Sequence, residues 1–166
     1  LDPLLILAVI GTESSFKPTA RSNAGAEGLM QVMTSVHEAK FDAFGGPEAA
    51  FDPYANMVVG TDILSYLIRR TGNVRRALKW YSGAANREDD RGYGARVMRE
   101  HGLLTVAAEG RTDAAVKLHR AGKSASEGGA GNAAKLGFAH WTKRSERTEG
   151  APRARNADLR GKAQAS

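Results

Sequence analysis

One apolar segment with a single acid near its end constrains this sequence most strongly. The stretch LLILAVIGTESSF carries no ionisable side chain other than Glu13. Asp2, ahead of it, is a favourable helix N-cap, Pro3 suits the first helical position, and Pro18 disfavours helical geometry at the residue before it. The pattern therefore predicts a helix from Pro3 to Phe16.

The predicted helix places Glu13 on its own apolar face. Ile6, Val9 and Ile10 lie seven, four and three positions before it, the spacing at which side chains stack along one side of a helix. Loss of hydration and the negative end of the helix dipole would both raise the pKa of this carboxyl. Glu13 is therefore a candidate proton donor; the alternative is an ordinary residue that closes a structural helix.

Charge is unevenly distributed along the chain. Of 166 residues with a net charge of +6, residues 1–106 hold 12 Lys and Arg against 12 Asp and Glu, whereas residues 107–166 hold 12 against 6. We therefore predict a neutral folded domain over 1–106 and a basic tail over 107–166. There is no cysteine, which excludes disulfides and thiolate metal sites, and no apolar run reaches the roughly 18 residues of a membrane span.

Helical spacing recurs along the first domain, and no segment shows the sustained alternation typical of strands. A loop rich in turn-forming residues, 17–28, precedes a predicted helix over 29–41 with Met30 and Gln31 in its first turn. His37 is interpreted as a solvated residue of that helix. Further helices are expected over 53–71, 74–81 and 92–104, so the domain is predicted to be all-α.

The tail is rich in Ala, Gly, Ser, Lys and Arg and has few large apolar residues. Such a composition cannot bury enough surface to offset the cost of ordering, so we expect it to be largely disordered, with a weak helix near 112–121. Its basic charge could contact an anionic polymer or a membrane surface, or simply be solvated. Because aromatic residues are not interleaved with the basic ones, specific nucleic-acid binding is not expected.

Two motifs in fixed order resemble a known enzyme family. The first is Glu13-Ser14-Ser15-Phe16; the second, after Ser22, is Gly28-Leu29-Met30-Gln31-Val32-Met33. Together they resemble the catalytic segment of the soluble lytic transglycosylases, lysozyme-like enzymes that cleave bacterial peptidoglycan. Later positions similar to landmarks of that family are Asp52-Pro53, Asn56, Gly60, Ala77, Tyr81, Tyr93 and Val97. The resemblance covers about residues 1–103 and implies an all-α, lysozyme-like fold.

The resemblance also implies a role for each matching residue. Glu13 matches the catalytic glutamate of the family. The other matches would hold or line the substrate: a serine near the acid, two groove residues, a tyrosine facing the acid and a later tyrosine, namely Ser22, Met30, Gln31, Tyr81 and Tyr93. Hydroxyl and amide groups suit the polar groups of sugars, whereas a thioether and aromatic rings form apolar walls.

The sequence departs from the family pattern at two places. Thr34 stands where the family commonly has proline, a change that mainly affects helix geometry. The usual tyrosine-asparagine-small-glycine sequence is Tyr81-Ser82-Gly83-Ala84 here, so the tyrosine is retained whereas the asparagine and the position of the glycine are not. We therefore expect this loop, and any contact of the asparagine with substrate, to differ.

A single acid is the expected catalytic group. Glycosidases generally use two carboxylates, but the second candidate, Glu27, is interpreted as a solvated loop residue. By resemblance, Glu13 protonates the oxygen between N-acetylmuramic acid and N-acetylglucosamine and then takes the proton of the muramoyl 6-hydroxyl, which attacks C1 and leaves a 1,6-anhydro end. No metal or other cofactor is expected.

Two alternatives remain open from the sequence. A goose-type lysozyme-like hydrolase would use water in place of the 6-hydroxyl, and a peptidoglycan-binding or assembly protein would keep the groove without turnover. The expected partners are peptidoglycan glycan strands and, beyond them, cell-envelope assembly or secretion machinery. We expect a monomer in the periplasm or cell envelope of a bacterium; this location is inferred from the substrate, since no signal peptide is recognisable in the sequence.

Overall fold

The computed structural model describes residues 1–127; the rest of the chain, which holds most of the tail expected to be disordered, lies outside the described residues. The described part is mainly helical, with two strands of two residues each, which confirms the all-α prediction. Its elements are α1 (Pro3–Ser14), β1 (Ala26–Glu27), β2 (Val32–Met33), α2 (Thr34–His37), the 3-10 helices η1 (Glu38–Lys40), η2 (Asp42–Phe44) and η3 (Pro47–Phe51), α3 (Pro53–Thr71), α4 (Val74–Tyr81), α5 (Tyr93–Ala108) and α6 (Thr112–Glu127).

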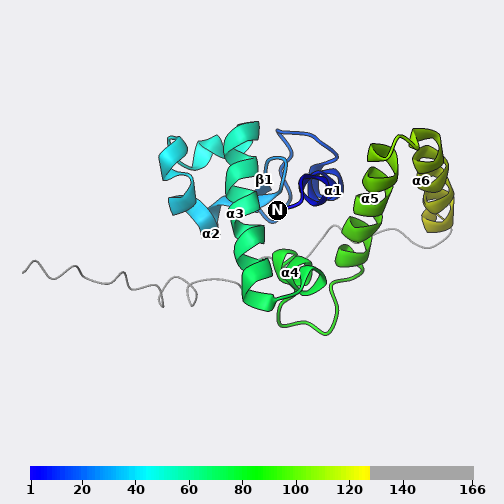
Figure 1. The fold of residues 1–166 in the computed structure, drawn as a ribbon. Coiled ribbons are helices and arrows are strands. Elements are labelled where there is room, and N and C mark those ends of the chain that lie inside the picture. Colours follow the sequence, from blue (N-terminus) through cyan, green and yellow to red (C-terminus); the bar gives the residue numbers. More distant parts are fainter. Residues whose placement is uncertain (128–166) are drawn as a thin grey trace, which may run out of the picture.

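The long helix α3 stands in the middle of the fold (Figure 1), with α2 and the 3-10 helices on one side and α1 on the other. α1 packs against α5, α3 packs against α4, and α6 folds back along α5 at the edge of the molecule. The core lies between these helices and the short hairpin of β1 and β2. Its largest fully buried side chains are Phe41, Ile10, Met30, Leu64, Leu78, Val9, Val97 and Asn56.

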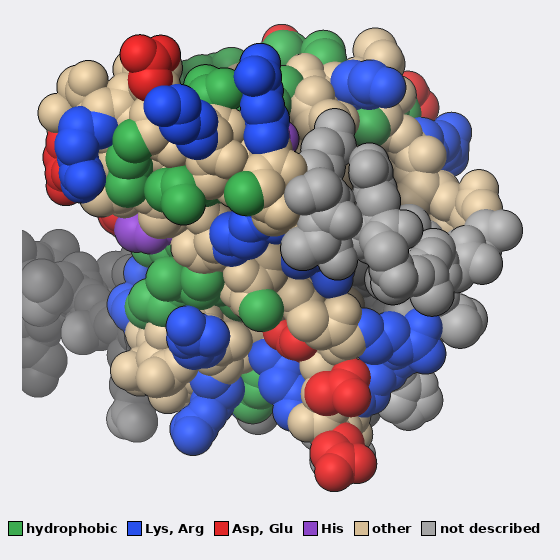
Figure 2. Space-filling view, turned by 90° about the vertical axis from the view of Figure 1, so that its right-hand side faces the viewer, with side chains coloured by type: hydrophobic (Ala, Val, Ile, Leu, Met, Phe, Trp, Pro, Cys, Tyr) green, Lys and Arg blue, Asp and Glu red, His purple; other side chains and the backbone are tan. Residues whose placement is uncertain are grey.

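The face on which α5 and α6 lie is rich in basic side chains. Figure 2 shows more Lys and Arg than Asp and Glu on this face, and Arg99, Lys117 and Arg120 of the two helices are exposed. A surface of one predominant sign attracts ligands of the opposite sign, less strongly as salt increases. Within residues 1–127, no helix is long and apolar enough to cross a membrane.

α1 begins as predicted but ends early. Asp2 Oδ1 accepts a hydrogen bond of 2.9 Å from the Leu4 backbone N–H, which confirms the predicted N-cap. The predicted end at Phe16 is wrong: the helix stops at Ser14, because Ser15 and Phe16 both adopt left-handed backbone conformations, with φ of 51° and 63°. Two such residues in a row end the helix, and the first of them lies two positions after Glu13.

The predicted helices over 53–71 and 74–81 are confirmed to the residue as α3 and α4. Their starts are capped as the sequence suggests: Asp52 accepts from the Ala55 N–H at 2.8 Å and Asn73 from the Arg76 N–H at 3.0 Å. α5 is longer than the predicted 92–104 and passes through residue 106, the expected domain boundary. The helix expected near 112–121 is present and extends further, as α6.

The predicted helix over 29–41 is wrong. Residues 29–31 form a turn, β2 pairs antiparallel with β1, and helical geometry covers only the four residues of α2 before η1 begins. Gly28 and Gln31 take left-handed φ values of 76° and 50°, which no helix accommodates. The apolar residues of the turn and hairpin are buried although they are not helical. Their spacing along the sequence resembles that of one helix face, which explains the wrong prediction.

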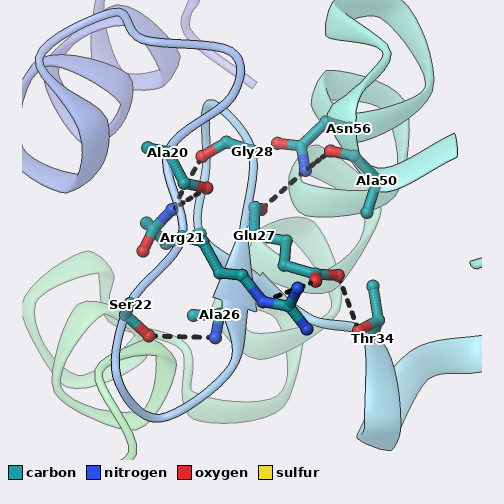
Figure 3. Close-up of polar contacts among 10 residues, drawn as sticks. Ala20, Arg21, Ser22, Ala26, Glu27, Gly28, Thr34, Ala50 and Asn56 are labelled. Carbon is teal, nitrogen blue, oxygen red and sulfur yellow. Dashed lines mark hydrogen bonds and ion pairs between the residues drawn. The ribbon is translucent and has the colours of Figure 1, made fainter. Parts of the chain in front are cut away.

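Asn56 of α3 holds the turn in place with its side-chain amide. Its Oδ1 accepts from the Met30 backbone N–H at 2.8 Å, and its Nδ2 donates to the carbonyls of Glu27 at 2.9 Å and Ala50 at 2.7 Å (Figure 3). A Cβ at Gly28 would lie 2.2 Å from both Asn56 Nδ2 and the Ala50 carbonyl oxygen, so only glycine fits beside this amide. The amide is fully buried and ties α3 to the turn at Glu27 and Met30 and to η3 at Ala50.

α3 approaches the same turn most closely at Gly60. A Cβ on Gly60 would lie 2.7 Å from Met30 Sδ and 2.8 Å from Met30 Cβ. We expect Gly60→Ala to lower the free energy of unfolding by about 1–3 kcal/mol, although alanine is the better helix former by about 1 kcal/mol. Gly102→Ala in α5 is the matched control, since its Cβ would have no heavy atom within 4 Å, and it should be neutral or stabilising. Urea unfolding of both variants measures this; equal stabilities would contradict close packing at Gly60.

Candidate active site

Glu13 lies at the contact between the end of α1 and the start of α5. Its Oε1 accepts a hydrogen bond of 2.7 Å from Tyr93 Oη, which joins residues 80 positions apart. Tyr93 is the first residue of α5, and only 6% of its surface is exposed. Val9 and Ile10, one turn back in α1, are buried in the core, and Glu13 itself is only partly accessible.

This environment changes the acidity of Glu13. Burial raises the pKa of its carboxyl from 4.5 to about 7, and the hydrogen bond from Tyr93 and the positive charge of Arg96 oppose that rise. The direction predicted from the apolar neighbours is confirmed. The pKa values of Tyr81 and Tyr93 are both raised well above 10, mainly by burial and also by the negative charge of Glu13. Both phenols therefore stay protonated beside a carboxyl that exchanges its proton near neutral pH.

Tyr81 connects α4 to the turn that follows the first strand. Its buried hydroxyl donates to the Met30 carbonyl oxygen at 2.9 Å. Met30 is 0% exposed, and its thioether packs against Gly60 and lies 3.8 Å from the Thr61 hydroxyl. The structure thus places the Met30 side chain in the core and not on an accessible groove wall. Its backbone, however, orients Tyr81.

The Gln31 amide is fixed in one orientation. Its Nε2 donates to the carbonyls of Ala20 at 3.1 Å and Gly28 at 3.0 Å, so both amide protons are used by the protein. Ser22 lies in the same loop, where its Oγ accepts from the Ala26 N–H at 2.9 Å and closes the turn before β1 (Figure 3). Ser22 therefore shapes the loop, while Gln31 presents its amide oxygen.

The interpretation of Glu27 as a solvated loop residue is wrong. Glu27 is 6% exposed, and its carboxylate pairs with Arg21 Nε at 3.2 Å and accepts from the Thr34 hydroxyl at 2.8 Å (Figure 3). Thr34, the residue that stands where the family commonly has proline, therefore has a structural task here. Both carboxylate oxygens of Glu27 have partners within or next to the hairpin. Glu27 is therefore not a second free acid.

A cleft that is partly open to solvent lies between the hairpin, α2, α3 and α4. Its walls include Gln31 and Tyr81, two of the residues predicted to contact substrate. Met33 lines the cleft, whereas Met30, the methionine expected on a groove wall, is buried in the core. The complete lining is Gln31, Val32, Met33, Val36, His37, Ile63, Leu67, Trp80, Tyr81 and Gly83.

His37 lines the cleft but was not among the predicted site residues. It was predicted to be solvated, but it is partly buried, and burial lowers its pKa to about 4, with a smaller contribution from Lys40. The imidazole is therefore neutral at neutral pH. The sequence offered no local signal for this, because the residues of α3 and α4 that share the cleft with His37 are distant from it in the chain.

The loop after α4 carries Ser82 and Gly83, the two positions that depart from the family pattern. The Ser82 hydroxyl donates to the Lys79 carbonyl at 2.9 Å, and so serves its own helix end. Gly83 takes a left-handed φ of 76° and lines the cleft. Within residues 1–127, no three His, Asp or Glu side chains are grouped so that they could hold a metal ion.

The fold of this chain has a counterpart among solved structures. The chain is similar to the crystal structure of the 70 kDa soluble lytic transglycosylase of Escherichia coli, with a TM-score of 0.56 and 22% identity over 66% of this chain and 22% of that one. This similarity establishes the fold class as the lysozyme-like helical fold.

The family follows from the sequence comparison. The family model described as "Transglycosylase SLT domain" matches residues 1–96. The chain therefore belongs to the SLT transglycosylase family. The matched segment runs from α1, which carries Glu13, into α5, which begins with Tyr93.

Three relatives illustrate the family relationship. The transglycosylase of Enterobacteria phage PRD1 is 35% identical over 63% of this chain and 39% of its own length. The soluble lytic murein transglycosylase of Escherichia coli K12 is 32% identical over 50% and 16%, and the membrane-bound lytic murein transglycosylase C of Cronobacter sakazakii is 45% identical over 40% and 20%. The match thus spans well under half the length of each of these relatives.

Proposed function

We propose that this protein is a peptidoglycan lytic transglycosylase with Glu13 as its single catalytic acid and base. The observation that carries the proposal is the carboxyl of Glu13, whose pKa lies at about 7 and whose position is fixed by Tyr93. A group with such a pKa can both give and take a proton near neutral pH. Gln31 and Tyr81 supply substrate contacts in the cleft, Met30 accepts the hydrogen bond that orients Tyr81, and Ser22 shapes the loop before β1.

The proposed reaction balances with one residue. Protonated Glu13 donates to the oxygen that links N-acetylmuramic acid C1 to N-acetylglucosamine, and the C1–O bond breaks. The muramoyl 6-hydroxyl oxygen bonds to C1, and its proton passes to the Glu13 carboxylate, which restores the acid. No water is consumed. The second carboxylate that most glycosidases require is not needed, which agrees with the engagement of Glu27 in the hairpin.

Product analysis tests this proposal against hydrolysis. Purified sacculi are incubated with the protein, and the soluble muropeptides are identified by mass spectrometry. Transglycosylation gives 1,6-anhydromuramoyl ends, whereas a goose-type lysozyme-like hydrolase gives reducing ends that are heavier by one water. Anhydro products support the proposal. Reducing ends would assign the activity to the hydrolase alternative, in which water takes the place of the 6-hydroxyl.

Replacing Tyr93 by phenylalanine is expected to move the pH dependence of this activity. The lost hydrogen bond stabilises the ionised form of Glu13, so the pKa of the carboxyl rises further above 7 in the variant. Glu13 then remains protonated to higher pH, and the alkaline fall of kcat/KM shifts upward, with a loss at the optimum of about tenfold or less. A pH–rate profile measures the shift; an unchanged alkaline limb would contradict the contact.

The binding alternative has one structural observation in its favour. Ser82 stands where the family has asparagine, and its hydroxyl bonds to the Lys79 carbonyl, so it offers the cleft no amide. A protein of this kind would bind purified sacculi and release no muropeptides. Sedimentation with sacculi, followed by analysis of the supernatant, separates this outcome from turnover in the same experiment.

The substrate also suggests the protein's location and partners. We propose peptidoglycan glycan strands as the substrate, and hence the periplasm or envelope of a bacterium as the place of action. The basic face of α5 and α6 (Figure 2) is complementary to the carboxylates of anionic wall material. A monomeric state, a role in envelope assembly or secretion machinery, and contacts of the basic tail remain expectations from the sequence, and most of the tail lies outside the described residues.

A further inference from the structure

Trp80 forms an edge of the cleft and has no part in the mechanism above. It is the residue before Tyr81 in α4 and lines the cleft together with Gln31, Tyr81 and Gly83. The indole packs against the hydrophobic core and yet remains partly exposed. An aromatic ring that is anchored on one side and open on the other is suited to contact a ligand.

Arg70 contacts the Trp80 ring and lies outside the cleft lining. The Arg70 guanidinium carbon lies 5.4 Å from the centre of the Trp80 ring and 5.9 Å from the centre of the Tyr66 ring. Its Nη1 also donates to Tyr66 Oη at 2.7 Å, one helical turn away in α3. A guanidinium that lies against two rings and is hydrogen-bonded to one of them favours one arrangement of the indole.

The remaining lining indicates what the ring would contact. None of the ten lining residues is Lys, Arg, Asp or Glu, and His37 is neutral. The cleft therefore disfavours a charged ligand. It offers apolar side chains together with a carboxamide and an imidazole, a combination that suits a pyranose ring, whose faces carry C–H groups and whose rim carries hydroxyl and amide groups.

The cleft shares one residue, Tyr81, with the surroundings of the acid. Tyr81 lines the cleft, and its phenol lies close enough to Glu13 to be affected by the charge of that carboxyl. A sugar held against Trp80 would thus belong to the same strand as the bond at Glu13. The identity of that strand rests on the proposed function.

We propose that Trp80 is a saccharide-stacking residue of this cleft, binding the apolar face of one N-acetylhexosamine ring of the glycan strand, and that Arg70 is its positioning residue. Trp80 supplies the contact surface. Arg70, which touches the indole and lies outside the cleft lining, keeps that surface in one orientation.

Tryptophan fluorescence tests the contact directly. The chain has two tryptophans, so Trp141→Phe leaves Trp80 as the single emitter, and Glu13→Gln prevents turnover during the titration. The full chain with both substitutions is titrated with chitotetraose, an oligosaccharide of N-acetylglucosamine. We expect a saturable change in Trp80 emission. A constant emission up to millimolar sugar would overturn the proposal.

Substitutions then separate stacking from general effects. In the Glu13→Gln background, calorimetry should show that Trp80→Ala binds chitotetraose about tenfold more weakly and that Trp80→Phe restores part of the affinity. Tyr54→Ala is the matched control, because Tyr54 is an aromatic residue of α3 that is 68% exposed and lies outside the cleft lining. An affinity of Trp80→Ala equal to that of Tyr54→Ala would overturn the proposal. If Trp80→Ala does not fold, the Trp80→Phe affinity and the fluorescence titration decide.

Arg70 is tested by a readout that a purely structural role would leave unchanged. Arg70→Ala should raise KM about threefold with kcat nearly constant and should alter the emission of Trp80 before any sugar is added. Arg70→Lys keeps the charge without the planar stack and should resemble Arg70→Ala. A fall in kcat alone would overturn the positioning role.

The two proposals fail separately. If wild-type protein releases no muropeptides although sugar binding depends on Trp80, the proposed function fails and the saccharide site stands. If turnover is normal and Trp80→Ala binds and cleaves like the wild type, the proposed function stands and the inference about Trp80 fails.

Discussion

Replacing Glu13 by glutamine is expected to reduce muropeptide release by a factor of about 10² to 10⁴, the range typical of a lost general acid or base. Glutamine has the same shape and can still accept the Tyr93 hydrogen bond, but it cannot donate a proton to the glycosidic oxygen and then recover one. The rate is measured on purified sacculi by the appearance of soluble muropeptides. Release near the wild-type rate would contradict the assignment of Glu13.

The same variant provides its own control for folding. Glu13 keeps its proton more tightly in the folded state, with a pKa of about 7, than in the unfolded state, where the value is 4.5. Its contribution to stability is therefore fully present below pH 4.5 and is lost as the pH rises through 7. Glu13→Gln removes this loss, so at pH 8 the variant should be more stable than wild type by about 1–3 kcal/mol. Urea unfolding at pH 4 and pH 8 measures the difference.

Asn56→Ala is expected to lower the free energy of unfolding by about 3–5 kcal/mol, because three buried backbone groups lose their partner together. These are the Met30 N–H and the carbonyls of Glu27 and Ala50. The turn that they hold carries Gln31 and supports Tyr81, so sugar binding should weaken as well. Thermal and urea unfolding measure the stability, and circular dichroism reports whether the helices persist.

Asn73→Ala is the matched control for this prediction. Asn73 also accepts a backbone N–H, that of Arg76, but it is exposed and caps only the start of α4. Its loss should cost about 1 kcal/mol, as is usual for a helix cap. Equal losses of unfolding free energy for the two substitutions would contradict the large stabilisation assigned to the three hydrogen bonds of Asn56.

Local sequence patterns predicted the helices well where the ends carry strong signals. Asp52 and Asn73 fix the starts of α3 and α4, and Gly72 ends α3 in a left-handed conformation. Each of these interactions acts within about four residues, so it can be recognised without knowledge of the rest of the chain. The environment of Glu13 was predicted for the same reason, since Val9 and Ile10 belong to its own helix.

The same patterns failed at the hairpin. Met30 and Met33 fit a helical period, but the backbone is diverted at Gln31 and held by Asn56, 26 residues away from the Met30 N–H that it binds. Glu27 and His37 were placed in solvent because nothing adjacent in sequence covers them. Their burial comes from segments that meet only in the folded protein.

The sequence by itself determined the helical class, the extent of α3 and α4 and the family to which residues 1–96 belong, because periodicity, caps and motifs are local properties. Only the tertiary structure decided that Tyr93 reaches Glu13, that Met33 lines the cleft in place of Met30, and that Arg70 stacks on Trp80. Those contacts join separate elements, and their formation depends on how the helices cross, which no short stretch of sequence encodes.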